Sequence, residues 1–127
     1  MIIIGEQKIQ NKIKPLLTSL REKKRYLAFE ILSEAKIEDF NAVSNAIWAK
    51  SLEYLGELGC AKAGILVLPD KYDTIGQKGL LKVSNRSLNE VKAALCLIDS
   101  INGKRAIVRT TGVSGILRKA HEKYIAK

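Results

Sequence analysis

Hydrophobic residues gather in four short segments whose pattern is typical of β-strands. In residues 26–32, Leu27, Phe29 and Ile31 share one face of an extended chain, and the opposite face is also mostly apolar. We therefore expect this strand to be covered on both sides and to lie inside a sheet. The same strand-like composition recurs in residues 63–68, 78–84 and 104–111.

Helical periodicity follows the first strand. Apolar residues recur over residues 38–58 at close to the helical period, and Gly56 and Gly59 mark the expected end of this helix. Ahead of the first strand, residues 15–20 form a short apolar segment that predicts one or two helical turns. Residues 1–14 are interpreted as a basic N-terminal extension. Within it, residues 5–14 are polar and basic apart from Ile9 and Ile13, which is compatible with disorder, and residues 15–127 are expected to form one domain.

Two serines are placed to begin the remaining helices. Ser87 and Glu90 have the spacing of a capping box and precede an apolar helical stripe. Ser114 follows the last strand and is expected to cap a C-terminal helix that extends to Tyr124.

The order of elements is β-α-β-β-α-β with an added C-terminal helix. The simplest fold is an α/β domain of the α+β sandwich type, with a four-stranded antiparallel, ferredoxin-like sheet, and the RNA-recognition motif shares this topology. Right-handed crossovers give the order 4-1-3-2, with the first strand between the fourth and the third. Residues 78–84 begin like the third strand of that motif but contain no aromatic residue, so base stacking on the sheet is not expected.

Positive charge is concentrated at both ends of the chain. The net charge of the 127 residues is +9. Residues 1–25 hold seven cations and two acids, and residues 104–127 hold seven cations and one acid, whereas the segment between them is slightly acidic. This balance predicts a polyanionic partner, either nucleic acid or an anionic membrane surface. Unstructured basic tails that serve solubility are the alternative.

The predicted sheet brings the two basic ends together. If the first strand lies beside the fourth, residues 21–25 approach Arg109 and the turn at 112–119. Ser114 and Gly115 would begin a helix, whose free backbone donors favour an anion. With Arg118 beside it, this turn is predicted to hold a phosphate, and contacts are expected to read the nucleic-acid backbone more than its bases.

Candidates for catalysis are few. His121 lies among cations on the last helix without a nearby nucleophile, and is interpreted as a surface residue. Glu30 and Glu34 can be considered as metal ligands of a nuclease, but Glu30 fits equally well as the partner of a Lys or Arg. No catalytic or metal-binding residue is therefore predicted.

The cysteines and the hydropathy pattern indicate the compartment. Cys60 and Cys96 stand alone in sequence and are both interpreted as buried small hydrophobic residues of a reduced protein. No apolar stretch approaches the roughly 18 residues of a membrane span, so we expect a cytoplasmic protein without a membrane partner.

Three stretches of this sequence resemble a known family. They are Ser19-Leu-Arg-Glu-Lys-Lys-Arg-Tyr-Leu-Ala-Phe-Glu-Ile31, Val91-Lys-Ala-Ala-Leu-Cys-Leu-Ile98 and Arg109-Thr-Thr-Gly-Val-Ser-Gly-Ile-Leu-Arg118. Together they look like the archaeal and eukaryotic ribonuclease P protein component 2 family, over about residues 15–124. Residues 1–14 fall outside the resemblance.

The resemblance implies a noncatalytic, RNA-binding subunit of ribonuclease P, the ribonucleoprotein endonuclease that removes the 5′ leader from precursor tRNA. In that family the RNA subunit carries Mg²⁺ and performs the hydrolysis, and no cofactor is expected on the protein. The implied partners are the ribonuclease P RNA, precursor tRNA through the complex, and ribonuclease P protein component 3. Self-association within an assembly of two copies of each protein is also implied.

The matching motifs carry the residues that we expect to contact RNA phosphates. These are Arg21, Lys23, Lys24, Arg25, Arg109, Ser114, Arg118 and Lys119. For contacts with protein partners, Trp48 and Tyr72 are the candidates.

Other functions remain open at this level. Composition and fold alone are equally compatible with a stand-alone RNA-binding or ribosomal-type protein. A ligand-sensing regulatory domain is disfavoured because the distinctive residues are cations at the termini. A protein-only nuclease would be recognised by cleavage of precursor RNA without an RNA subunit.

Overall fold

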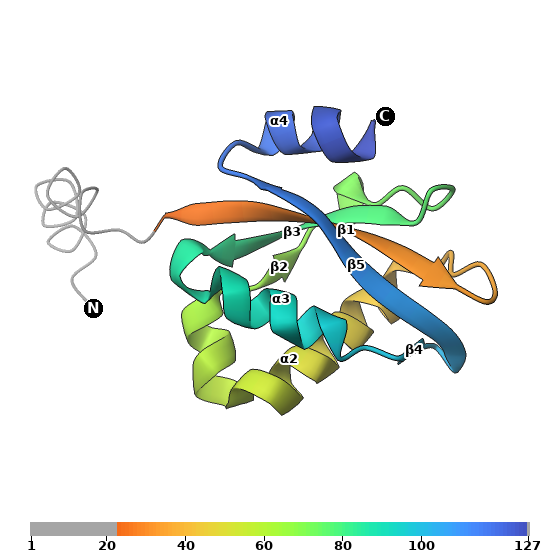
Figure 1. Ribbon diagram of the computed structural model, residues 1–127, viewed down its shortest axis with the longest axis horizontal. Helices are drawn as coiled ribbons and strands as arrows, with labels where there is room; N and C mark the ends of the chain where they lie inside the picture. Colours follow the sequence, from red (N-terminus) through yellow and green to blue (C-terminus); the bar gives the residue numbers. More distant parts are fainter. Residues whose placement is uncertain (1–22, 127) are drawn as a thin grey trace, which may run out of the picture.

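The computed structural model describes residues 23–126, in which five antiparallel strands form one sheet with helices on both of its faces (Figure 1). The strands are β1 (Lys24–Ser33), β2 (Leu66–Val67), β3 (Lys78–Ser84), β4 (Ser100–Ile101) and β5 (Lys104–Ser114). The fold is therefore of the α+β class.

The strand order is β2-β3-β1-β5-β4. As the sequence predicted, β1 lies between the strand at 78–84 and the last long strand, antiparallel to both. The expected four-stranded sheet is corrected to five, because Ser100 and Ile101 pair with Arg105 and Lys104 as an additional edge strand. Two residues are too few for an alternating pattern, so β4 leaves no signal in the sequence.

The middle of the central strand β1 is buried on both faces, as its composition indicated. Leu27, Phe29 and Ile31 lie in the main core with the two long helices, while Ala28 belongs to a second core on the opposite face. The ring of Phe29 covers Gly79 directly across the strand pair, and a Cβ on Gly79 would stand 2.6 Å from its Cζ. This close approach explains why a glycine is tolerated inside β3.

Helix α2 (Phe40–Ala63) continues past the point where the sequence predicted its end. Asp39 caps it by accepting a hydrogen bond from Asn41 N at 2.9 Å. Gly56 does not end the helix but kinks it, with φ of 75° and ψ of 174°, a conformation that L side chains rarely adopt. The helix ends instead at Gly64, which has left-handed dihedral angles.

Helix α3 (Leu88–Cys96) lies beside α2 on the same face of the sheet (Figure 1). It begins where the sequence predicted, but Ser87 makes no side-chain capping hydrogen bond, so the predicted capping box is wrong. Short 3-10 turns precede β3 and α3: η1 (Pro69–Lys71) and η2 (Asn85–Ser87).

The C-terminal segment covers the opposite face of the sheet (Figure 1). It consists of α4 (Leu117–Ala120) and a π-helical turn, η3 (His121–Ile125). Ala120 and Ile125 pack on Ala28 and Leu80 in the second core, which confirms the predicted helix but moves its start beyond Ser114. The predicted helical turns at 15–20 and the extension at 1–14 lie outside the described residues.

The contact between Gly112 and Tyr124 is predicted to hold the C-terminal segment on the sheet. A Cβ on Gly112 would overlap the ring of Tyr124, so Gly112→Ala should force the ring away and lower the free energy of unfolding by about 1–3 kcal/mol. Urea unfolding measures this decrease. In a Tyr124→Ala background the same substitution should have little effect; an equal effect in both backgrounds would contradict the contact.

The two cysteines should differ in reactivity. Cys60 is buried in α2, and burial raises the pKa of its thiol; Cys96 is exposed, which corrects the expectation that both are buried. Since only the thiolate is nucleophilic, and a raised pKa leaves less of it near pH 8, iodoacetamide should alkylate Cys96 first. Peptide mass spectrometry gives the site. Comparable alkylation rates of Cys60 and Cys96 in the folded protein would show that α2 is not packed as described. In urea, where the protein is unfolded, the two alkylation rates should converge.

Candidate nucleic-acid interface

The basic start of β1 lies beside the end of β5. Tyr26 is opposite Ser114 in the strand register. On the other side of β1, Lys24 is opposite Ser84 at the end of β3, and Asn85 N donates a hydrogen bond to the Lys23 carbonyl at 2.7 Å. This arrangement confirms the expected meeting of the first strand's start with the last strand's end.

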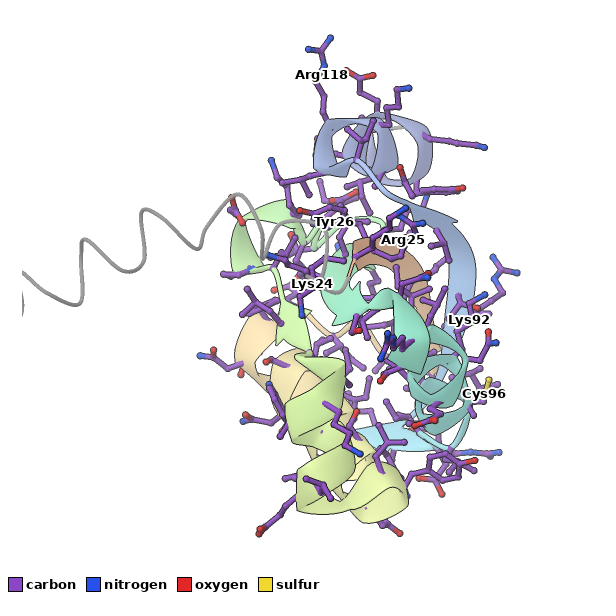
Figure 2. All side chains as sticks on the ribbon, turned by 90° about the vertical axis from the view of Figure 1, so that its left-hand side faces the viewer. Lys24, Arg25, Tyr26, Lys92, Cys96 and Arg118 are labelled. Atoms are coloured by element: carbon purple, nitrogen blue, oxygen red, sulfur yellow. The ribbon has the colours of Figure 1, made fainter. Side chains whose placement is uncertain are left out.

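Lys24 and Arg25 each contact a glycine at this end of the sheet. The position that a Cβ would take on Gly115 is 2.9 Å from one terminal guanidinium nitrogen of Arg25. Lys24 Nζ is equally close to the corresponding position on Gly64, where it balances the negative C-terminal end of α2. Figure 2 shows both side chains at the level of the sheet, below the C-terminal segment. Two cations thus lie against backbone on either side of β1.

Ser114 is the last residue of β5 and not a helix cap. Its hydroxyl accepts a hydrogen bond from Ile116 N and donates one to Ile116 O, both at 3.1 Å. The residue that precedes α4 is Ile116, which has no side-chain cap, and α4 itself has only four residues. The predicted helix start at Ser114, with its row of free donors, is therefore wrong.

Arg109 lies away from the basic run at the start of β1. It is opposite Glu30 in the register and forms an ion pair with it. Five positions along β1 separate Glu30 from Arg25, which is about 16 Å in an extended strand. The predicted approach of the first basic run to Arg109 is therefore wrong, whereas the alternative role of Glu30 as the partner of an arginine is confirmed.

The C-terminal segment contributes two further cations above the sheet. The exposed side chain of Arg118 pairs with Glu122 at 3.3 Å, one helical turn later. Figure 2 shows Arg118 pointing away from the body of the protein. Lys119 is also exposed. Such an exposed ion pair is worth at most about 1 kcal/mol, so Arg118 can exchange Glu122 for a phosphate with little loss of stability.

Two cations that the sequence did not single out lie at the same end of the molecule. Lys62 is two residues before Gly64, which Lys24 contacts, and Arg86 follows Asn85, which binds Lys23. Lys62 and Arg86 both line a cleft of about 580 Å³ beside the end of α2. No pattern in the sequence marks them, because each is an isolated cation in a segment whose overall charge is slightly acidic.

The structure does not test one residue of the predicted phosphate-binding set. Arg21 lies outside the described residues. Its contact with an RNA phosphate therefore stays a prediction from the sequence.

The candidates for protein contacts differ in exposure. Trp48 is partly exposed on α2. Tyr72 packs against Phe40 and donates a hydrogen bond from its hydroxyl to the Ile37 carbonyl at 3.2 Å. Burial, and secondarily the charge of Asp73, raise the pKa of that hydroxyl. Tyr72 therefore has a structural role in the main core.

The acidic side chains do not form a metal site within the described part of the chain. Across residues 23–126, no three side chains of His, Cys, Asp or Glu gather closely enough to hold a metal ion. Glu34, which was considered as a metal ligand, accepts a hydrogen bond from the Arg105 backbone at 3.0 Å.

None of the helices between residues 23 and 126 is both long and apolar enough to span a bilayer.

A family model and several known proteins resemble this chain. The family model described as the Rpp14/Pop5 family matches residues 25–125. Ribonuclease P protein component 2 of Thermococcus gammatolerans is 39% identical over 94% of this chain and 97% of its own length. The protein of the same name from Pyrococcus horikoshii is 37% identical over the same shares, and that of Methanosarcina acetivorans is 38% identical over 89% of this chain and 82% of its own.

A solved structure of a ribonucleoprotein includes a chain with the same fold. A chain in the cryo-EM structure of yeast ribonuclease MRP superposes with a TM-score of 0.60, covering 77% of this chain and 78% of that chain. The sequence identity is 14%, so this likeness supports the arrangement of strands and helices alone.

Proposed function

The chain belongs to the Rpp14/Pop5 family, and from this membership we propose that it is a protein subunit of ribonuclease P. Its relatives of 34–39% identity bear the name ribonuclease P protein component 2. Within that ribonucleoprotein, the proposed role is to bind and stabilise the catalytic RNA that cleaves the 5′ leader from precursor tRNA.

The observation that carries the RNA-binding role is the meeting of cations from separate segments at one end of the sheet. Lys23, Lys24 and Arg25 lie at the start of β1, and Arg118 and Lys119 follow the turn that ends β5. Lysine and arginine side chains neutralise phosphates and release counterions, and arginine adds a bidentate geometry. We define this group of five residues as the basic end.

Two residues of the predicted phosphate-binding set are proposed to contribute less to RNA binding. Arg109 already neutralises Glu30, and the Ser114 hydroxyl is engaged with Ile116.

Three cations outside the basic end complete the proposed RNA-binding surface. Lys62 and Arg86 are included because they lie next to residues that contact Lys24 and Lys23. Arg21 is retained from the sequence motif.

Recognition is proposed to depend on RNA shape and backbone. The face on which an RNA-recognition motif stacks bases is here covered by α4 and η3, with Tyr26 and Tyr124 packed into the second core. These two aromatic rings are partly buried, so they are less suited to base stacking than the open aromatic rings of such a motif. The sheet without β4 is the proposed equivalent of a four-stranded ferredoxin-like core.

The chemistry is proposed to reside in the RNA. Hydrolysis and the Mg²⁺ ions that support it belong to the RNA subunit, and this chain supplies no catalytic group. Ribonuclease P protein component 3 is the proposed protein partner, in an assembly of two copies of each, and the cytoplasm is the proposed location.

Reconstitution tests this function directly. The cognate ribonuclease P RNA should cleave precursor tRNA faster at low magnesium when this protein and component 3 are added, because neutralised phosphates lower the metal concentration needed to fold the RNA. This protein without the RNA should give no cleavage. Cleavage without RNA would indicate a protein nuclease, and RNA binding without any effect on cleavage would favour a stand-alone RNA-binding protein.

The basic end should account for much of the salt dependence of RNA binding. Changing Lys23, Lys24 and Arg25 to glutamine should lower the slope of log affinity against log salt by roughly one for each phosphate that is no longer neutralised. Filter binding across a salt series measures the slope.

A matched variant controls for net charge. Lys36, Lys50 and Lys71 are changed to glutamine instead, which removes the same charge from other parts of the surface. The slope of this variant should stay near that of the unmodified protein. Equal effects of the two variants would mean that overall charge, and not the basic end, determines binding.

A further inference from the structure

The outer edge of β5 is open along most of its length in the described part of the chain. β4 pairs only with Lys104 and Arg105, and from Ala106 to Ser114 the partner of β5 within residues 23–126 is β1. Figure 1 shows β5 crossing the front of the sheet with β4 only at its lower end. An open strand edge presents unpaired backbone donors and acceptors that can pair with another strand.

Two hydrogen bonds determine which backbone groups face outward. Ala106 N donates to Asp99 O at 3.1 Å, so the backbone of Ala106 faces away from β1. Arg105 O accepts from Glu34 N, also at 3.1 Å, so the backbone of Arg105 faces towards β1. Since this direction alternates along a strand, Val108 and Thr110 present their N–H and C=O groups outward.

The register fixes the end of the open edge. It shifts between Ala28 and Phe29, which leaves Thr111 of β5 without an opposite residue in the described sheet. Such a bulge bends the strand and interrupts regular pairing. The edge suited to a further strand therefore runs from Ala106 to Thr110.

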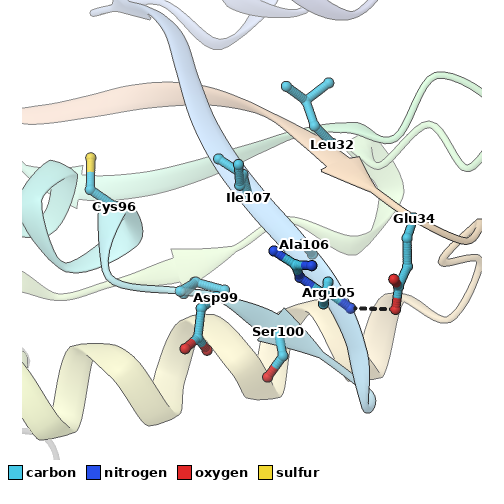
Figure 3. A pocket seen from close by; sticks show the side chains of 9 residues that line it. Leu32, Glu34, Cys96, Asp99, Ser100, Arg105, Ala106 and Ile107 are labelled. Carbon is cyan, nitrogen blue, oxygen red and sulfur yellow. Dashed lines mark hydrogen bonds between the residues drawn. The ribbon is translucent and has the colours of Figure 1, made fainter.

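An apolar pair lies on the face beside this edge. Leu32 and Ile107 are directly opposite each other, and the two residues are 48% and 62% exposed. The C-terminal segment covers Ala28 and Leu80 on the same face but leaves this pair exposed. Figure 3 shows the two side chains on neighbouring strands, and both belong to the lining of a cleft.

The lining of the cleft beside the edge has a small excess of negative charge. The volume of the cleft is about 740 Å³, and its lining includes the carboxylates of Glu34 and Asp99 and the exposed Cys96. Among the described residues that line it, Arg105 is the one cation. An incoming segment with an apolar residue for Leu32 and Ile107 and a lysine or arginine for the carboxylates complements this surface.

We propose that the edge of β5 from Ala106 to Thr110 binds an extended segment of another protein as an added β-strand. Backbone hydrogen bonds to Val108 and Thr110 hold the segment, an apolar side chain covers Ile107, and a basic side chain enters the cleft. This mode of binding combines main-chain pairing with pockets for alternate side chains. It goes beyond the proposed RNA-binding role and uses none of the residues of the basic end.

A second copy of the chain and RNA fit this edge less well. If two β5 strands paired antiparallel with their Ile107 side chains together, Arg105 of each copy would lie opposite Arg109 of the other, and like charges directly opposite are destabilising. RNA phosphates would meet Glu34 and Asp99. The charge of the cleft thus favours a basic segment of a different protein.

A defined set of peptides tests this edge on the full chain. The probes are capped heptapeptides that alternate valine with threonine and carry a lysine near either end, added to ¹⁵N-labelled protein. Amide signals of Val108 and Thr110 should shift, and alkylation of Cys96 should slow as the cleft fills. Peptides with N-methylated backbone amides should bind at least about tenfold more weakly, since N-methylation removes the donors that a strand pair needs.

Matched variants separate this site from nonspecific hydrophobic binding. Ile107→Lys should weaken peptide binding about tenfold, because it places a cation where the apolar contact is made, close to Arg105. Ile75→Lys changes another exposed isoleucine, in the loop before β3, and should bind the peptides normally. Unchanged urea unfolding midpoints would show that both variants are folded.

Several results would overturn the proposal. They are the absence of shifts at Val108 and Thr110 with every peptide at millimolar concentration, equal binding of the N-methylated peptides, and shifts confined to the basic end. Shifts at these amides that depend on protein concentration alone would overturn it in favour of a second copy as the occupant. The glutamine variant of Lys23, Lys24 and Arg25 should keep peptide binding, so this inference and the RNA-binding role can fail separately.

Discussion

The position of β1 between β3 and β5 is the constraint on which the rest of the structure depends. Leu27, Phe29 and Ile31 are buried on one face and Ala28 on the other, and both edges of β1 are paired, so the strand is suited only to an interior position in the sheet. A shift of one residue would exchange Phe29 for Ala28 in the main core and remove the ring from Gly79. The register with both neighbours follows from this burial.

That register also determines where the charges lie. The cations that precede the buried part of β1 are fixed beside the end of β5 and the end of α2. Towards the opposite end of β1, the same pairing places Glu30 against Arg109 and Leu32 against Ile107. One strand therefore separates a basic end from an apolar and slightly acidic edge, and the two surfaces suit different kinds of partner.

Much of the fold was predictable because its evidence is local. The alternation in β1, the bounds of β3 and the predicted neighbours of β1 are confirmed. The errors involve features whose cause is not local. Gly56 was expected to end α2, but residues on both sides of the kink pack into the same core and the helix continues. Serine is a common helix cap, which is why Ser114 was expected to begin the last helix, but its pairing with Tyr26 keeps it in β5.

The sequence by itself determined the fold class, the burial of β1 and the presence of excess positive charge at both ends of the chain, since each depends on residue types and their spacing. Only the tertiary structure decided which charges become neighbours. Arg109 lies outside the expected cluster of cations because the register pairs it with Glu30. Lys62 and Arg86 lie near the cations at the start of β1 because α2 and β3 end beside that strand. Contacts between distant segments depend on strand order, register and one bulge, and these are fixed only when the whole core packs.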